Sequence, residues 1–209
     1  MGFDRRRLLA AAGGLGAAAA LSPQLNPLNI RQVEAGVGDF FEGEPGCNRV
    51  AIIFNIGAGY EPAISVLDTL KAYEARATLF LMGWWLDNQP DTARYIATYG
   101  HPLGSHGNLP PELTARSDDD VKADIWATEE AFLRVLGYKP EPIMTAFAGA
   151  SDYRVNGIAS LLGYTMVGWE VETADWNPDV TASMIYDSVA NNVYDGAIIE
   201  MHLDASTSA

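Results

Sequence analysis

The sequence has one cysteine, Cys47, and three histidines among its 209 residues. A single cysteine cannot form an internal disulfide bond, so the fold must be stable without one. It also excludes redox motifs that need two thiols and zinc sites that are built from several thiolates.

Basic residues are scarce as well. There are 13 Lys and Arg against 27 Asp and Glu, which gives a formal net charge of −14. Binding to DNA, RNA or anionic lipid depends on clustered basic side chains, so these partners are excluded and neutral or cationic ligands are favoured. Solubility or adaptation to a salty medium also explains the charge, and we favour that explanation over a role in attracting substrate.

A long apolar run is also lacking at the N-terminus, where the run is too short to span a membrane. This run follows Arg5, Arg6 and Arg7 and ends near Leu21, with small residues close to its end. This pattern is typical of an export signal, and the paired arginines followed by two leucines favour the twin-arginine route. We expect residues 1–21 to be removed and the mature protein to be secreted, periplasmic or at the cell surface, without stable membrane insertion. An uncleaved interfacial anchor is the alternative.

The rest of the chain divides into a linker and one domain. Residues 22–47 are rich in Pro, Asn, Gly and Glu without periodicity, which is typical of a linker. In residues 48–209, short apolar runs alternate with segments of helical period, which predicts an α/β domain with a parallel sheet closed into a barrel. We predict strands at residues 50–54, 77–82, 102–105, 143–147, 165–169 and 197–201, and the longest helix at residues 117–136.

Residues that could carry chemistry follow the predicted strands. In parallel α/β folds, functional groups gather at the carboxyl ends of the strands, so these residues are expected to converge at one mouth of the barrel. The residues at or just past the strand ends are Asn55, His106, Ala148, Glu170 and His202.

Five short segments near these ends occur in a characteristic order, at residues 54–57, 100–106, 111–113, 172–176 and 198–202. Together they resemble the motif series of the polysaccharide deacetylases, the NodB-homology family. The resemblance covers residues 48 to about 204 and implies a distorted (β/α) barrel with fewer than eight repeats.

The resemblance also implies an activity. In the family, a divalent metal, usually zinc, is held by one aspartate and two histidines and activates a water that attacks the acetyl group of an amino sugar. A carboxylate takes the proton of that water, and a histidine protonates the leaving amine. The implied reaction is hydrolysis of a non-peptide carbon–nitrogen bond, and the implied partner is a polysaccharide or oligosaccharide of the chitin or peptidoglycan type.

Four positions depart from the family pattern. Asn55 stands where the family has its base, and Ile56 and Pro110 stand at two of the three metal-ligand positions. Thr145 replaces an arginine that positions the base. An amide has no proton affinity near neutral pH and isoleucine has no lone pair, so we expect no resident metal and a degenerate site.

Four other positions keep the family's residue. His106 stands at the first metal histidine, Asp175 at the carboxylate that orients the acid, Trp176 at a tryptophan of the groove and His202 at the acid. The resemblance therefore implies a sugar contact at Trp176. For His106 we favour a hydrogen-bonded remnant over a functional role, and the Asp175–His202 pair could equally be functional or structural.

Further acidic and aromatic residues lie near the same motifs. Carboxylates beside a histidine could form a rebuilt metal site, although we expect most of these to be ordinary solvated acids. Strand alternation places Glu200 on the same face as His202, so Glu200 is the first candidate. For Trp169 we expect packing in the core. The remaining acids are Glu112, Glu170, Glu172 and Asp204, and the remaining tryptophans are Trp84 and Trp85.

Few residues follow His202, whereas the family plan adds another helix and a closing strand. We expect a truncated sequence at this end, with an open barrel as the alternative. Three functions remain: a degenerate deacetylase that binds N-acetylated amino-sugar polymers without metal-dependent hydrolysis, an active deacetylase with a substitute site, or a structural or partner-binding protein. The lost ligands favour the first over the second, and the retained Asp175, Trp176 and His202 favour it over the third.

Overall fold

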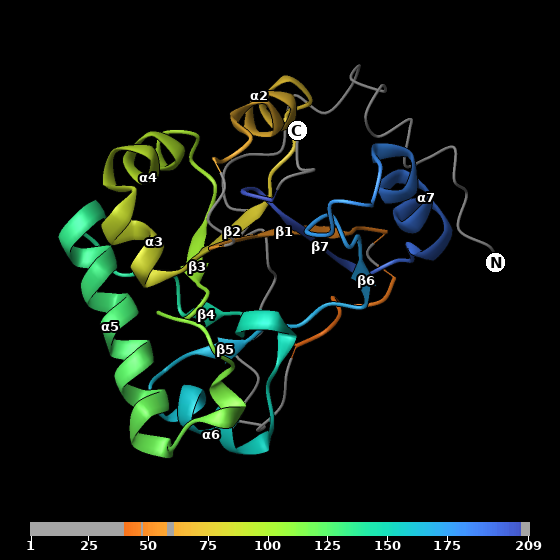
Figure 1. The fold of residues 1–209 in the computed structure, drawn as a ribbon. Helices are drawn as coiled ribbons and strands as arrows, with labels where there is room; N and C mark the ends of the chain where they lie inside the picture. Colours follow the sequence, from red (N-terminus) through yellow and green to blue (C-terminus); the bar gives the residue numbers. More distant parts are fainter. Residues whose placement is uncertain (1–39, 47, 58–60, 206–209) are drawn as a thin grey trace.

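The computed structural model describes residues 40–46, 48–57 and 61–205, in which seven parallel strands form one curled sheet (Figure 1). The strand order is β5-β4-β3-β2-β1-β7-β6. This half-barrel confirms the predicted α/β class and the distorted barrel with fewer than eight repeats. The strands are β1 (Ala51–Ile56), β2 (Thr78–Leu81), β3 (Leu103–Ser105), β4 (Ile143–Met144), β5 (Thr165–Met166), β6 (Val171–Glu172) and β7 (Ile198–His202).

Helices lie outside the sheet, with α3 to α6 along one side and α7 at the opposite side (Figure 1). Within the described residues, no helix is both long and apolar enough to cross a membrane. The predicted export signal lies outside these residues. The helices are α2 (Ile64–Ala72), α3 (Gly83–Asn88), α4 (Pro90–Ala97), α5 (Asp118–Leu136), α6 (Tyr153–Leu161) and α7 (Ala182–Asn192), with 3₁₀ turns η1 (Leu113–Ala115) and η2 (Phe147–Gly149).

The longest predicted helix is α5, and its ends have clear chemical causes. Ser117 caps the first turn, because its hydroxyl oxygen accepts the backbone N–H of Asp120 at 3.3 Å. Three aspartates, at residues 118–120, lie in that turn, where the helix dipole stabilises negative charge. The helix ends at Gly137, whose φ of 84° is unfavourable for other residues.

Side chains of the interior strand β1 alternate between two environments. Phe54 and Ile56 belong to the apolar cluster that packs against α2, α3 and α4. Ile53 belongs to a second cluster on the other face of the sheet. Asn55 lies on that second face and is in register with His202 of β7, so the barrel interior receives a polar residue from each of two neighbouring strands.

An N-terminal segment joins the two sides of the open barrel. Phe40 forms a bridge with Val167, and Glu42 forms one with Ala197. The backbone N–H of Gly43 also donates to the carbonyl of Gly196 at 2.7 Å. These contacts precede residue 48, the residue at which the sequence suggests that the domain begins.

The edge strands are shorter than the sequence predicts. The predicted strand at residues 165–169 ends at Met166, and the backbone N–H of Gly168 then donates to the carbonyl of Phe40 at 2.9 Å. The ring of Phe41 fills the space beside Gly168, 2.4 Å from where a Cβ would lie. Strand β6 was not predicted, because two residues give no periodic signal.

Candidate functional site

A cavity of about 760 Å³ opens at the carboxyl ends of the strands. Five of the residues that the motifs single out line it, from β1, β7 and the loops between them. Asp175 lies behind one of these residues, His202, and is fully buried. Ala148, at the end of the fourth predicted strand, also lines the cavity. The five residues are Asn55, His106, Pro110, Trp176 and His202.

Asn55 is fixed by side chains on both of its amide atoms. Its Oδ1 accepts the hydroxyl proton of Thr145 at 2.8 Å, and its Nδ2 donates to Oε1 of Glu200 at 3.1 Å. Because Thr145 uses its proton on Asn55, its oxygen accepts from Nδ1 of His106 at 2.7 Å. This pattern fixes His106 as the tautomer with its lone pair on Nε2.

On the other side of the cavity, His202 lies between two carboxylates. Its Nδ1 donates to Oδ1 of Asp175 at 2.9 Å and lies 3.3 Å from Oε1 of Glu200. Its backbone N–H donates to the second oxygen of Asp175 at 2.8 Å. A continuous chain of polar contacts therefore runs across the cavity, through His106, Thr145, Asn55, Glu200, His202 and Asp175.

Burial and neighbouring charges set the protonation of these groups. Burial and the charge of His202 lower the pKa of His106 to about 3, against the hydrogen bond to Thr145, so His106 is neutral near neutral pH. Burial lowers the pKa of His202, but the hydrogen bond to Asp175 and the charge of Glu200 outweigh it, so the pKa lies above its usual value. Burial raises the pKa of Glu200 to about 7.

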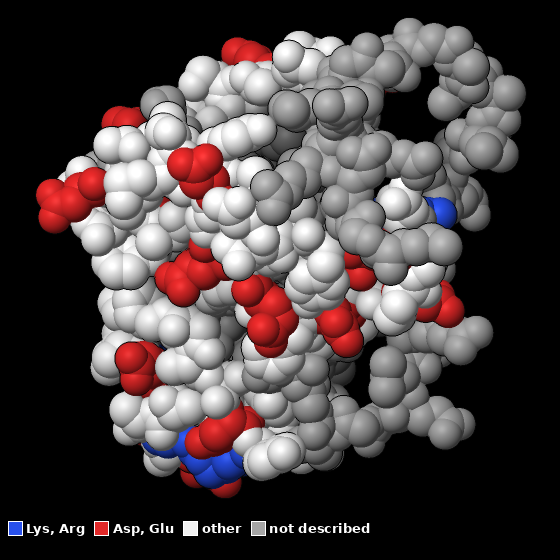
Figure 2. Space-filling view, turned by 90° about the vertical axis from the view of Figure 1, so that its right-hand side faces the viewer, with Lys and Arg blue, Asp and Glu red and all other residues white. Residues whose placement is uncertain are grey.

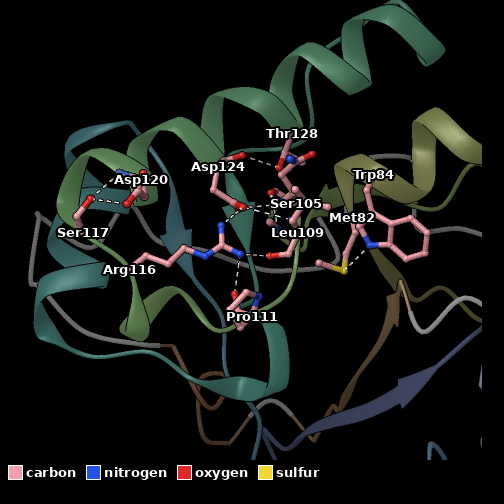
Figure 3. A network of polar contacts seen from close by, with 12 residues as sticks. Met82, Trp84, Ser105, Leu109, Pro111, Arg116, Ser117, Asp120, Asp124 and Thr128 are labelled. Atoms are coloured by element: carbon pink, nitrogen blue, oxygen red, sulfur yellow. Dashed lines mark hydrogen bonds and ion pairs between the residues drawn. The ribbon is translucent and has the colours of Figure 1, made fainter.

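The loop that carries Pro110 is held by a buried ion pair (Figure 3). The carboxylate of Asp124, on α5, accepts the backbone N–H groups of Asn108 at 2.7 Å and Leu109 at 3.2 Å. Arg116 donates to the same carboxylate at 2.6 Å and to the carbonyls of Leu109 and Pro111. The sequence analysis did not identify Asp124. The signal was present, because Asp124 is an acid three residues after Val121 and lies on the apolar face of α5.

The residues at the family's metal position do not fit a metal ion. His106 offers one lone pair, Pro110 offers none, and Asn55 is engaged at both amide atoms. Ile56 is fully buried in the apolar cluster and does not line the cavity. Since zinc sites use three or four ligands, one imidazole is too few.

The sequence left open a rebuilt metal site of carboxylates beside a histidine, and the structure brings three such side chains together. One ligand-type atom from each of Asp175, Glu200 and His202 lies within 4.8 Å of the others. However, both oxygens of Asp175 accept hydrogen bonds from His202, so the contacts are those of an imidazole held between two carboxylates. Glu112 and Glu170 are exposed and lie outside this group.

Aromatic rings form much of the remaining wall. Trp84, Trp169 and Trp176 line the cavity, and Trp85 lies in the core. The expected core packing of Trp169 is found, because it packs against the inner cluster, and Trp169 also lines the cavity. The indole of Trp176 is 53% exposed, and its N–H donates to Glu172 at 3.2 Å. It is therefore placed to stack on a ligand.

The family assignment rests on comparisons with known proteins. A family model described as polysaccharide deacetylase matches residues 42–167. A peptidoglycan-N-acetylglucosamine deacetylase of Bacillus cereus is 31% identical over 162 residues, which is 78% of this chain and 58% of that protein. The corresponding deacetylase PgdA of Listeria monocytogenes is 30% identical over 161 residues, 77% of this chain and 34% of that protein. The chain thus spans only part of the length of these relatives.

Solved structures agree on the fold. The Bc1960 peptidoglycan N-acetylglucosamine deacetylase superimposes with a TM-score of 0.73 at 30% identity, over 80% of this chain and 78% of that one. A CE4 family pseudoenzyme from Bacillus anthracis superimposes with a TM-score of 0.76 at 23% identity, over 82% of this chain and 60% of that one. The chain belongs to the polysaccharide deacetylase family.

Proposed function

We propose that this chain is a degenerate deacetylase that binds N-acetylated amino-sugar polymers, of the chitin or peptidoglycan type, without metal-dependent hydrolysis. The observation that carries the proposal is the hydrogen-bonded chain from His106 to Asp175, which occupies the cavity where the family has its metal and base. Asn55 cannot act as a base, since its amide has no proton affinity near neutral pH. The polar groups are committed to one another instead of to a metal.

The cavity nevertheless suits a sugar chain. Its indole and phenyl rings offer flat apolar surface, which stacks on sugar faces at low entropic cost. Asp175 and His202 keep the arrangement of an oriented imidazole. The printed names of the relatives specify peptidoglycan amino sugars, which supports this substrate class. Secretion to the cell surface follows from the same proposal, because such polymers lie outside the cytoplasm.

The test compares metal content and acetate release. The purified mature protein is expected to hold well below one equivalent of zinc and to release no acetate from chito-oligosaccharides above the rate of a protein-free blank. Losing the base alone costs roughly 10²–10⁴ in rate. Acetate release that zinc stimulates and a chelator abolishes would favour the alternative, an active deacetylase with a substitute site.

Sugar binding should depend on Trp176. Trp176→Ala is expected to weaken chito-oligosaccharide binding about tenfold, because a stacking ring contributes on the order of 1 kcal/mol or more. The unfolding midpoint should stay close to the original, since the ring is 53% exposed. Isothermal titration calorimetry measures the first effect and thermal unfolding the second.

A matched control is Trp126→Ala. Trp126 is 50% exposed, lies on α5 and does not line the cavity. Equal losses of affinity in both variants, or none in Trp176→Ala, would argue against a sugar contact at Trp176.

A further inference from the structure

The charges on the cavity wall have one sign. Among the residues that the structure describes, the wall contains two carboxylates, Glu172 and Glu200, and no Lys or Arg. Of the two imidazoles on the described wall, His106 has a pKa of about 3, and His202, which lies 3.3 Å from Glu200, already faces Asp175. The outer surface continues this trend, as Figure 2 shows acidic groups spread over one face and basic groups mainly at its lower edge.

The two carboxylates lie side by side. Glu172 of β6 is in register with Glu200 of β7, and neighbouring strands place such side chains on the same face about 5 Å apart. Glu172 is exposed at the rim, beside the indole of Trp176, whereas Glu200 is 2% exposed at the floor. Together they form an acidic track from the rim to the floor.

The floor carboxylate has one oxygen left for a ligand. The contacts of Glu200 with Asn55 and His202 both use Oε1. Within the described part of the chain, Oε2 of Glu200 makes no hydrogen bond. It is also not fully buried, so it is open to the cavity. A ligand in the cavity can therefore reach it.

Further negative charge lies behind this floor. Asp175 and Asp204 are fully buried, and Asp204 accepts the backbone N–H of Gly57 at 3.0 Å. Asp175 and Asp204 both raise the pKa of His202, so their negative charge is felt at the cavity floor. A cation that enters the cavity therefore gains electrostatic free energy.

We infer that the acidic track takes the protonated amino group of a deacetylated glucosamine unit, with the sugar ring stacked on Trp176. This inference rests on the proposed function and names the unit of the polymer that the site prefers. At the rim, an ammonium group contacts Glu172 and the face of an indole. At the floor, it contacts Oε2 of Glu200. An acetamide in the same place is neutral and cannot make these charged contacts with either carboxylate.

The preference also places the protein in a reaction sequence. Free amino groups on such polymers arise by N-deacetylation, the reaction named for the relatives that retain the family's activity. A member that binds the deacetylated unit would act after that reaction, on its product. It needs no metal of its own for this role.

The experiment compares two tetrasaccharides by isothermal titration calorimetry, fully acetylated chitotetraose and its fully deacetylated form, in a buffer near pH 7, because the pKa of Glu200 is about 7 and a more acidic buffer would neutralise its carboxylate. The deacetylated form is expected to bind about tenfold more tightly, and added salt should reduce this ratio. Glu172→Gln and Glu200→Gln should each lower the ratio severalfold. Glu170→Gln is the matched control, because this exposed acid lies two residues away and outside the cavity wall.

The outcomes separate this inference from the proposed function. Equal or tighter binding of the acetylated form overturns the inference and leaves the proposed function standing. Failure of the acetylated form to bind overturns the proposed function, whether or not the deacetylated form binds. Glu172 is exposed, so its variant remains informative even if Glu200→Gln fails to fold. A ratio that Glu170→Gln lowers as much as Glu172→Gln would show a general charge effect and would overturn the acidic track.

Discussion

Asp124→Ala is expected to lower the free energy of unfolding by about 3–5 kcal/mol, because it leaves Arg116 without its carboxylate partner in a largely buried position. The side chain of Asp124 is 2% exposed and that of Arg116 is 16% exposed. The same substitution removes the acceptor of two backbone N–H groups, those of Asn108 and Leu109. Urea unfolding followed by circular dichroism measures the loss.

Asp119→Ala is the control for this prediction. Asp119 pairs with Lys122 at the surface of the same helix, and exposed pairs contribute between 0 and about 1 kcal/mol. The Asp124 variant should also bind oligosaccharide more weakly, since the loop that it holds brings Pro110 to the cavity wall. A loss below about 1 kcal/mol would mean that the loop is held by other contacts.

The strands whose extent the sequence predicted best are those with a strong pattern. Residues 51–56 and 198–202 form the neighbouring strands β1 and β7, and both carry apolar runs long enough to give a clear signal. Strands β4 and β5 were predicted too long and β6 was missed, because the extent of these two-residue strands is set by pairing with their neighbours in the sheet, which no local pattern records. The contacts of Phe40 with Met166 and Gly168 join segments far apart in the chain and could not be predicted either.

Site residues were predictable where a motif identified their type. Asn55, His106 and His202 came from strand ends, and Glu200 came from alternation along β7. The hydroxyl of Thr145, which bridges His106 and Asn55, was missed. The sequence shows that Thr145 stands where the family has an arginine, but it does not show which groups the threonine contacts.

The direction of Ile56 was also missed, although the sequence contained the signal. Asn55 and Ile56 are consecutive in a strand, so their side chains must point to opposite faces of the sheet. With Asn55 in the cavity, Ile56 must face the helices, where it is fully buried. A motif aligned by position does not carry this information.

Ile56→Asp is therefore expected to lower the free energy of unfolding by about 3–5 kcal/mol. Removing a buried isoleucine side chain costs about 2–5 kcal/mol, and a carboxyl group in an apolar cluster adds a desolvation cost. The conservative variant Ile56→Val should cost only about 0.5–1.5 kcal/mol. Urea unfolding of both variants gives the comparison, and equal small losses would show that this position is not part of the packed core.

Adding zinc tests whether position 56 can still hold a metal ligand, as in the family, or serves only in packing. A ligand that binds only the folded state raises the unfolding midpoint, so a restored metal site would appear as a zinc-dependent rise in Ile56→Asp combined with Pro110→His, which together with His106 would supply three ligands. We expect no such rise, because residue 56 points to the helix layer while His106 faces the cavity. A rise that a chelator reverses would show that the strand end can turn its side chain towards the cavity. The hydrogen-bonded chain through Asn55 would then be a replaceable arrangement and would not by itself exclude a metal.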